Sequence, residues 1–256
     1  MHLEIGGQDY LDGSVSIEEL TSFYDRTGKV PKTAGVSPYQ YEVIFGKIKD
    51  ENPDAVILHL CYSAKLSCGY QNSIIADDGS IPVYRADIKN VSMGQAFIVM
   101  KTAELIEKQP GIEPEELVAR VEAITAKTRF SFVPGNLDYL RAGGRVSNAQ
   151  YLGAKILRLK PLIEVKDGLM ISTKKYRGSN KEIISRMLSD FFAGYSLDKS
   201  EIYFGYACSI DSVTQRDMEK QAAEAGIRNV VWLKAGGVIT AHSGPGGIGV
   251  AGMELQ

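Results

Sequence analysis

Residues 54–71 read Asp54-Ala55-Val56-Ile57-Leu58-His59-Leu60-Cys61-Tyr62-Ser63-Ala64-Lys65-Leu66-Ser67-Cys68-Gly69-Tyr70-Gln71. An almost uninterrupted apolar run of strand length ends here in small and hydroxylated residues. Apolar side chains then recur four residues apart at Leu66, Tyr70 and Ile74, as on one face of a helix. The stretch therefore predicts a buried strand that leads through a short loop into a helix.

The junction between this strand and this helix is a candidate anion site. Helix N-termini carry unpaired backbone N–H groups and the positive end of the helix dipole, and the hydroxyls of Ser63 and Ser67 add donors. A carboxylate or a phosphate would suit such a site. The alternative is that the two serines only cap the helix.

The residues that follow repeat the order of strand and helix. Residues 81–86 are predicted as a second strand, and 93–108 have apolar residues at helical spacing. Two strands that alternate with helices predict a parallel sheet with helices on its faces. Ligands of such sheets bind beyond the carboxyl ends of the strands, where Ser63 and Asp87 fall.

The first 53 residues contain helix signals but no core strand that we can recognise. We expect residues 1–15 to be irregular. Ser16 and Ser37 are each followed three residues later by Glu or Gln, so each predicts a capping box at the start of a helix. Between these helices, residues 31–36 are expected to be a loop or an extended segment that carries Thr33.

The pattern changes near residue 128. Residues 129–133 are predicted as a strand, and the Asp167-Gly168 turn between two apolar runs predicts a hairpin. We therefore expect an α/β protein of two domains. The first, 1–128, has a parallel sheet, and the second, 129–256, is an α/β domain with antiparallel strands.

A histidine near the C-terminus is a second candidate binding residue. Residues 238–242 are predicted as a strand that ends at His242, directly before the glycine-rich segment 244–249. Glycines allow backbone to come close to a ligand, and imidazole can bind an anion or move a proton. Helix 212–225 is predicted to begin with a capping box at Ser212.

Ser63 and His242 also allow a different class of function. With Asp87 as third member they would form the catalytic triad of a small-molecule hydrolase. The nucleophile elbow G-x-S-x-G is not present around Ser63. The hydrolase is therefore kept as the alternative.

Composition excludes several kinds of partner. The 256 residues include 29 basic and 31 acidic side chains, which give a net charge of -2. The chain therefore lacks the excess of positive charge that is typical of proteins that bind nucleic acid. The apolar runs are far shorter than the roughly 20 residues that cross a bilayer, and the N-terminus does not resemble a signal peptide. The three cysteines have no metal-ligand spacing. We expect a cytoplasmic protein with no membrane insertion, no metal and no cofactor.

Five ordered motifs of this chain resemble the DegV family of bacterial fatty-acid-binding proteins. Residues 33–37 are similar to the family's T-S-x-P-S loop, and 63–71 to its S-S-G-L-S-G-T-Y-Q segment. The other matches are 136–147 with D-T-L-x-Y-L-x-x-G-G-R-I-S, 160–168 with K-P-I-L-x-x-x-D-G, and 242–249 with H-T-G-P-G-x-x-G. Five matches in the same order are more specific than any single one.

The resemblance implies a protein that carries a long-chain fatty acid in a tunnel between two domains and has no catalytic centre. The residues that it implies for the carboxylate are Thr33, Ser63, Ala64 through its backbone, Ser67 and His242. Some family members present the acid to a separate fatty-acid kinase, and Arg145 is the candidate for docking that partner.

The chain also departs from the family pattern. The family's first core strand and its acidic turn are not recognisable here. Ala34 replaces a hydroxyl, and Lys65, Cys68 and Gly69 replace Gly, Gly and Thr. These changes leave a third interpretation open, a regulatory binding module that has lost its lipid and whose tunnel has collapsed.

Overall fold

The structure is a computed structural model that describes residues 1–144 and 159–255. Its strands are β1 (His2–Ile5), β2 (Gln8–Leu11), β3 (Lys32–Ala34), β4 (Ile57–Cys61), β5 (Val83–Asp87), β6 (Thr128–Val133), β7 (Lys160–Lys166), β8 (Leu169–Tyr176), β9 (Ile202–Tyr206), β10 (Val230–Lys234) and β11 (Ile248–Met253). Its helices are α1 (Ile17–Thr27), α2 (Pro38–Glu51), α3 (Gly69–Ile75), α4 (Ser92–Lys108), α5 (Pro114–Lys127), α6 (Leu137–Ala142), α8 (Asn180–Gly194), α9 (Ser212–Glu224) and α10 (Gly237–Ser243). Arg145, the candidate docking residue, lies outside the described residues.

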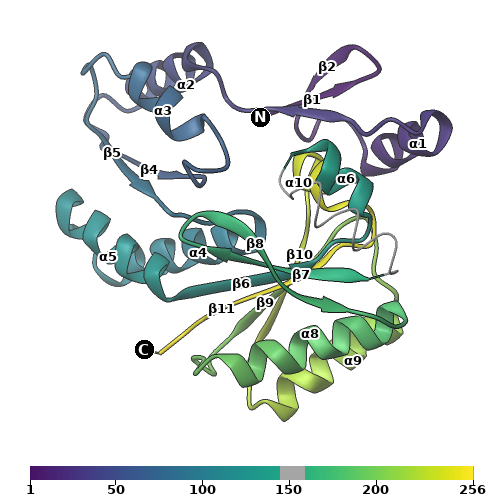
Figure 1. Ribbon diagram of the computed structural model, residues 1–256. Coiled ribbons are helices and arrows are strands. Elements are labelled where there is room, and N and C mark those ends of the chain that lie inside the picture. Colours follow the sequence, from purple (N-terminus) through teal and green to yellow (C-terminus); the bar gives the residue numbers. More distant parts are fainter. Residues whose placement is uncertain (145–158, 256) are drawn as a thin grey trace.

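A six-stranded mixed sheet in the order β10-β9-β11-β6-β7-β8 is the largest sheet of the described chain (Figure 1). Strand β11 is antiparallel to both β6 and β9, and β9 is parallel to β10. The predicted hairpin is confirmed as β7 and β8, with Asp167 and Gly168 at positive φ as a tight turn requires. Helices α8 and α9 cover one face of this sheet, and α4 lies against the other.

The predicted parallel pair is confirmed in the first half of the chain. Strands β4 and β5 are parallel, with α3 between them and α4 after them. Apolar side chains of both strands and of α4 and α5 form one buried cluster, which includes Leu60, Ala86, Ile98 and Val121. The sheet places the loops that follow Cys61 and Asp87 side by side.

The expectation for residues 1–15 was wrong. They form the hairpin β1–β2, and β3 pairs antiparallel with β1 to complete a three-stranded sheet. The signal was present, because Leu3 and Ile5 are buried alternately and Gly6-Gly7 supplies a two-residue turn with positive φ. The strands were missed because each has only four residues.

This small sheet packs on the second half of the chain. Leu3 and Leu20 share a buried cluster with Tyr139, Val238 and Ala241, which belong to α6 and α10. Asp12, after β2, accepts a hydrogen bond from the backbone N–H of Val238 at 3.2 Å. Figure 1 shows β1 and α1 above α6 and α10, so the N-terminal residues help to position α10.

Two further predictions need correction near the C-terminus. Residues 238–242 belong to helix α10 rather than to a strand, because packing against β1 and α6 outweighs the strand propensity of Val238, Ile239 and Thr240. Helix α9 is capped by Asp211 and not by Ser212, since the Asp211 carboxylate accepts from the N–H groups of Val213 and Thr214. Among the described residues, no helix has both the length and the apolar character needed to cross a bilayer.

Candidate functional site

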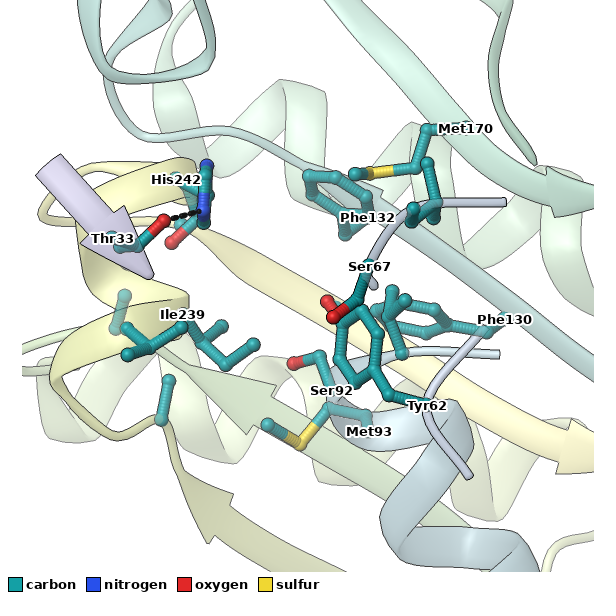
Figure 2. Close-up of a pocket in the computed structure, with 18 of the residues that line it drawn as sticks. Thr33, Tyr62, Ser67, Ser92, Met93, Phe130, Phe132, Met170, Ile239 and His242 are labelled. Carbon is teal, nitrogen blue, oxygen red and sulfur yellow. Dashed lines mark hydrogen bonds between the residues drawn. The ribbon is translucent and has the colours of Figure 1, made fainter. Parts of the chain in front are cut away.

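A cavity of about 520 Å³ lies where α10, β3, the loop after β4 and the start of α4 meet the six-stranded sheet (Figure 2). Its volume falls within the roughly 300–1,000 Å³ of pockets that hold small-molecule ligands. Of the residues proposed from the sequence, Thr33, Ala64, Ser67 and His242 line this cavity. The structure thus brings together four positions that lie as much as 209 residues apart.

One end of the cavity is polar. The hydroxyl oxygen of Thr33 lies 2.9 Å from Nε2 of His242, and which of the two donates depends on the histidine tautomer. The ring is also confined by the chain at the end of α6: a Cβ added to Gly143 would lie 2.1 Å from Nδ1 of His242. The imidazole is therefore held between the Thr33 hydroxyl and the backbone of Gly143.

Helix α10 ends shortly after His242, at Gly244, where the backbone conformation requires glycine. Gly244 ends the helix with φ of 71°, and its N–H donates to the carbonyl of Thr240 at 2.8 Å. A Cβ at this position would lie 2.8 Å from the backbone nitrogen of Asn136. Only glycine fits, and the turn that it permits leaves His242 in the last turn of the helix, facing Thr33 (Figure 2).

The loop after β4 supplies the next polar groups. Ser67 lines the cavity, and its oxygen accepts a hydrogen bond from the N–H of Gly69 at 3.2 Å. The N–H of Ala64 already has a partner within the protein, Oδ1 of Asp87 at 3.3 Å. Helix α3 begins with Cys68 at the capping position, and the Cys68 side chain accepts no hydrogen bond from a backbone N–H of the helix. The Ser67 oxygen bonds the first N–H group of α3, so the interpretation that the serines cap the helix holds for Ser67 and is wrong for Ser63, whose hydroxyl donates to the carbonyl of Gly168.

Ser63 occupies a different position from the one expected. It is fully buried, it is not among the residues that line the cavity, and its hydroxyl donates to the carbonyl of Gly168 at 2.7 Å. Gly168 belongs to the turn between β7 and β8, and a Cβ there would lie 2.7 Å from the Ser63 oxygen. Ser63 thus fastens the loop after β4 to the hairpin of the second half.

The triad of the alternative hydrolase is not assembled. The hydroxyl proton of Ser63 is committed to the Gly168 carbonyl, and Asp87 accepts from the backbone N–H groups of Ala64 and Lys89. The ring nitrogen Nε2 of His242 meets Thr33 instead. A serine nucleophile needs a base within hydrogen-bond reach and an orienting group on that base, and these three residues do not supply this arrangement.

The remaining wall of the cavity is largely apolar and was not predicted. It includes the rings of Phe130 and Phe132, which stack with their centroids 5.5 Å apart, and the thioethers of Met93 and Met170. Ser92 adds a hydroxyl that the sequence analysis missed (Figure 2). Its signal was the same as that of Ser63, a hydroxyl shortly after a strand, because Ser92 follows β5 by five residues.

Two titratable groups of β4 lie outside the cavity wall. Burial, together with the positive charge of Arg85, lowers the pKa of His59 to about 4. Burial raises the pKa of the Cys61 thiol to about 12, so that thiol stays protonated and unreactive near neutral pH. Cys68, in contrast, is exposed and lines the cavity.

Comparison with known proteins gives consistent results. A family model described as "Uncharacterised protein, DegV family" matches residues 1–254. A Thermotoga maritima protein named "Fatty acid-binding protein" is 29% identical over 247 residues, which cover 93% of this chain and 83% of that protein.

Solved structures resemble the chain over nearly its whole length. One, described as fatty acid binding of a DegV family protein from Thermus thermophilus, has a TM-score of 0.85 at 24% identity and covers 99% of this chain and 90% of its own. The Streptococcus pneumoniae Fatty Acid Kinase (Fak) B3 protein, loaded with linoleic acid, has a TM-score of 0.83 at 19% identity and covers 100% and 89%. These likenesses confirm the predicted two-domain α/β fold, and the division at residue 128 stays a prediction.

Proposed function

The chain belongs to the DegV family, and on this premise we propose that it binds a long-chain fatty acid in the cavity of Figure 2 and has no catalytic centre of its own. The observation that carries the proposal is the shape of the site, an apolar cavity with one polar end. A cavity that remains open at about 520 Å³ also favours a carrier over a module whose tunnel has collapsed.

The apolar wall would bind the tail of the acid. About fourteen methylenes at about 0.8 kcal/mol each would contribute roughly 11 kcal/mol of gross transfer free energy. A hydrogen bond to a carboxylate contributes about 1.5–3 kcal/mol. The tail would therefore set most of the affinity, and the polar groups would set the position of the carboxylate.

The carboxylate would lie at the polar end, within reach of Thr33, His242 and Ser67. Thr33 and His242 are supported by their mutual contact, and Ser67 by its place in the cavity wall. Ala64 borders the same space, although its N–H would have to leave Asp87 to reach a ligand. We assign Ser63 an indirect role, because its hydroxyl bonds the loop after β4 to the carbonyl of Gly168.

We further propose that the protein works in the cytoplasm and presents the bound carboxylate to a separate fatty-acid kinase. Arg145 would be a docking residue for that kinase. The support is the likeness to the Streptococcus pneumoniae structure, which is described as part of a fatty acid kinase. The test is transfer of labelled phosphate from ATP to the fatty acid by a purified fatty-acid kinase. Transfer should require this protein and should fall when Arg145→Ala replaces the wild type.

The test of binding is mass spectrometry of the lipid extract from protein purified under native conditions. We expect about one equivalent of long-chain acid with the wild type and much less with Ile239→Trp, which would fill the cavity. Ile106→Trp is the matched control, because Ile106 is exposed on α4 and does not line the cavity. A lipid-free wild type that also fails to take up added acid would contradict the proposal.

A further inference from the structure

Two glycines form part of the cavity wall on neighbouring strands. Gly205 of β9 and Gly249 of β11 are direct partners in the antiparallel ladder, and both line the cavity. Neither position has a side chain, so neighbouring side chains can approach the backbone of the sheet there. The room above each glycine is then set by whatever side chain lies nearest to it.

Above Gly205 that side chain is Met93. A Cβ added to Gly205 would lie 2.2 Å from Sδ of Met93, 2.4 Å from Cγ and 2.8 Å from Cε. The thioether of Met93 therefore occupies the space that a side chain at position 205 would need. Met93 also lines the cavity, so one side chain both packs against the sheet at Gly205 and forms part of the cavity wall.

Met93 is held in this place by its surroundings. It lies in the first turn of α4, is 6% exposed, and belongs to a buried cluster with Phe97, Phe130 and Tyr203. Close-packed neighbours leave little free space on that side. The cavity is the open volume beside the thioether, so a group that displaces Met93 from Gly205 would push it toward the ligand.

Gly249 differs in what covers it. A Cβ there would lie 3.0 Å from the ring of Phe130, 3.3 Å from Cβ of Phe132 and 3.4 Å from the carbonyl oxygen of Ser131. These are stiff rings and backbone rather than the end of a flexible chain. Met93 is thus the adaptable group over this glycine pair, since its unbranched thioether can change rotamer at low cost.

We infer that Met93, seated on Gly205, sets the length of the acyl chain that the cavity accepts. The inference rests on the proposed function, in which the carboxylate lies at the Thr33–His242 end. Figure 2 shows Met93 well apart from that pair, on another side of the cavity. With the carboxylate fixed, a change in the wall at Met93 changes how many methylenes fit.

The experiment measures dissociation constants for saturated acids from dodecanoic to eicosanoic acid. The optimum is the chain length that binds with the lowest dissociation constant. Met93→Ala should move this optimum to longer acids, with affinity rising about fourfold for each extra methylene that becomes buried. Gly205→Ala should move it to shorter acids, because its methyl group displaces the thioether into the cavity. In the double variant Met93→Ala/Gly205→Ala the shortening should disappear, since no thioether remains to be displaced.

Met100→Ala is the matched control, because Met100 lies on the same helix, is 48% exposed and does not line the cavity. Its optimum should equal that of the wild type. An unchanged optimum in either Met93→Ala or Gly205→Ala, in a variant that is folded, would overturn the inference while leaving the proposed function intact. A wild type that binds no acid of any length would instead overturn the proposed function. The two single variants predict opposite shifts, so a folding defect in one leaves the other decisive.

Discussion

The hydroxyl of Thr33 and Nε2 of His242 lie 2.9 Å apart, although 209 residues separate them in the sequence. Thr33 is held by β3, and His242 by the last turn of α10. The two elements meet because the small sheet β2-β1-β3 packs on α10, where Leu3 and Val238 share a buried cluster. The polar end of the cavity therefore depends on contact between the first and the last parts of the chain.

Gly143→Ala should disturb this end directly. The new methyl group would lie 2.1 Å from Nδ1 of His242, so the ring must leave its present position, and its contact with Thr33 through Nε2 is disturbed. We expect weaker fatty-acid binding, by about tenfold or more if one hydrogen bond to the carboxylate is lost. Gly46→Ala is the control, because nothing lies within 4 Å of its added Cβ. Equal affinity of Gly143→Ala and wild type in a binding titration would show that the ring position is not needed.

The two serines of the loop after β4 should give opposite results. Ser63→Ala removes the donor to the buried Gly168 carbonyl and should lower the free energy of unfolding by about 1–3 kcal/mol. Each kcal/mol should lower Tm by about 2–4 °C. Ser67→Ala should change Tm little and should weaken binding, since Ser67 lines the cavity. Thermal unfolding and calorimetry distinguish them. The assignment fails if Ser63→Ala binds less well at an unchanged Tm.

Thiol labelling provides a test that needs no substitution. Cys68 is exposed and lines the cavity, so a maleimide should label it first and bound fatty acid should slow the reaction. Cys208 is partly exposed and does not line the cavity, so its rate should not respond to the acid. Cys61 is buried, with a thiol pKa of about 12, and should react only after unfolding. Peptide mass spectrometry reports the three rates, and protection of Cys208 rather than Cys68 would place the ligand elsewhere.

His59 should make stability depend on pH. Its pKa is lowered from 6.5 to about 4 in the folded protein, so between these values the unfolded chain binds more protons than the folded one. Stability should therefore fall as the pH decreases from about 6.5 to about 4, and this contribution should be constant above that window. His59→Gln should show a smaller loss over the same range in denaturant titrations. Parallel curves for wild type and variant would mean that His59 does not drive the effect.

Much of the fold could be predicted from local sequence. The run 54–60, the capping box at Ser37 and the Asp167-Gly168 turn each carried a signal that does not need distant contacts, and the structure has β4, α2 and the β7–β8 hairpin there. Helix α10 was predicted as a strand because its β-branched residues have strand propensity, whereas its packing partners β1 and α6 are remote in the sequence.

The site was predictable only in part, for the same reason. Motif similarity pointed to Thr33, Ser67 and His242, and all three line the cavity. The sequence could not show that Ser63 turns toward Gly168, because that bond joins residues 105 positions apart. Nor could it show that Met93 covers Gly205, since neither residue belongs to a recognisable motif.

Calorimetric titration of lipid-free protein with hexadecanoic acid tests the central claim most directly. For the wild type we predict saturable binding at one site with a negative heat-capacity change, as burial of an apolar chain requires. Thr33→Ala should weaken binding by about one to two orders of magnitude, the value of one hydrogen bond to a carboxylate. Thr21→Ala, on α1 and outside the cavity wall, should bind like the wild type. No saturable binding by the wild type, or equal affinity of Thr33→Ala and wild type, would contradict a fatty acid held with its carboxylate between Thr33 and His242.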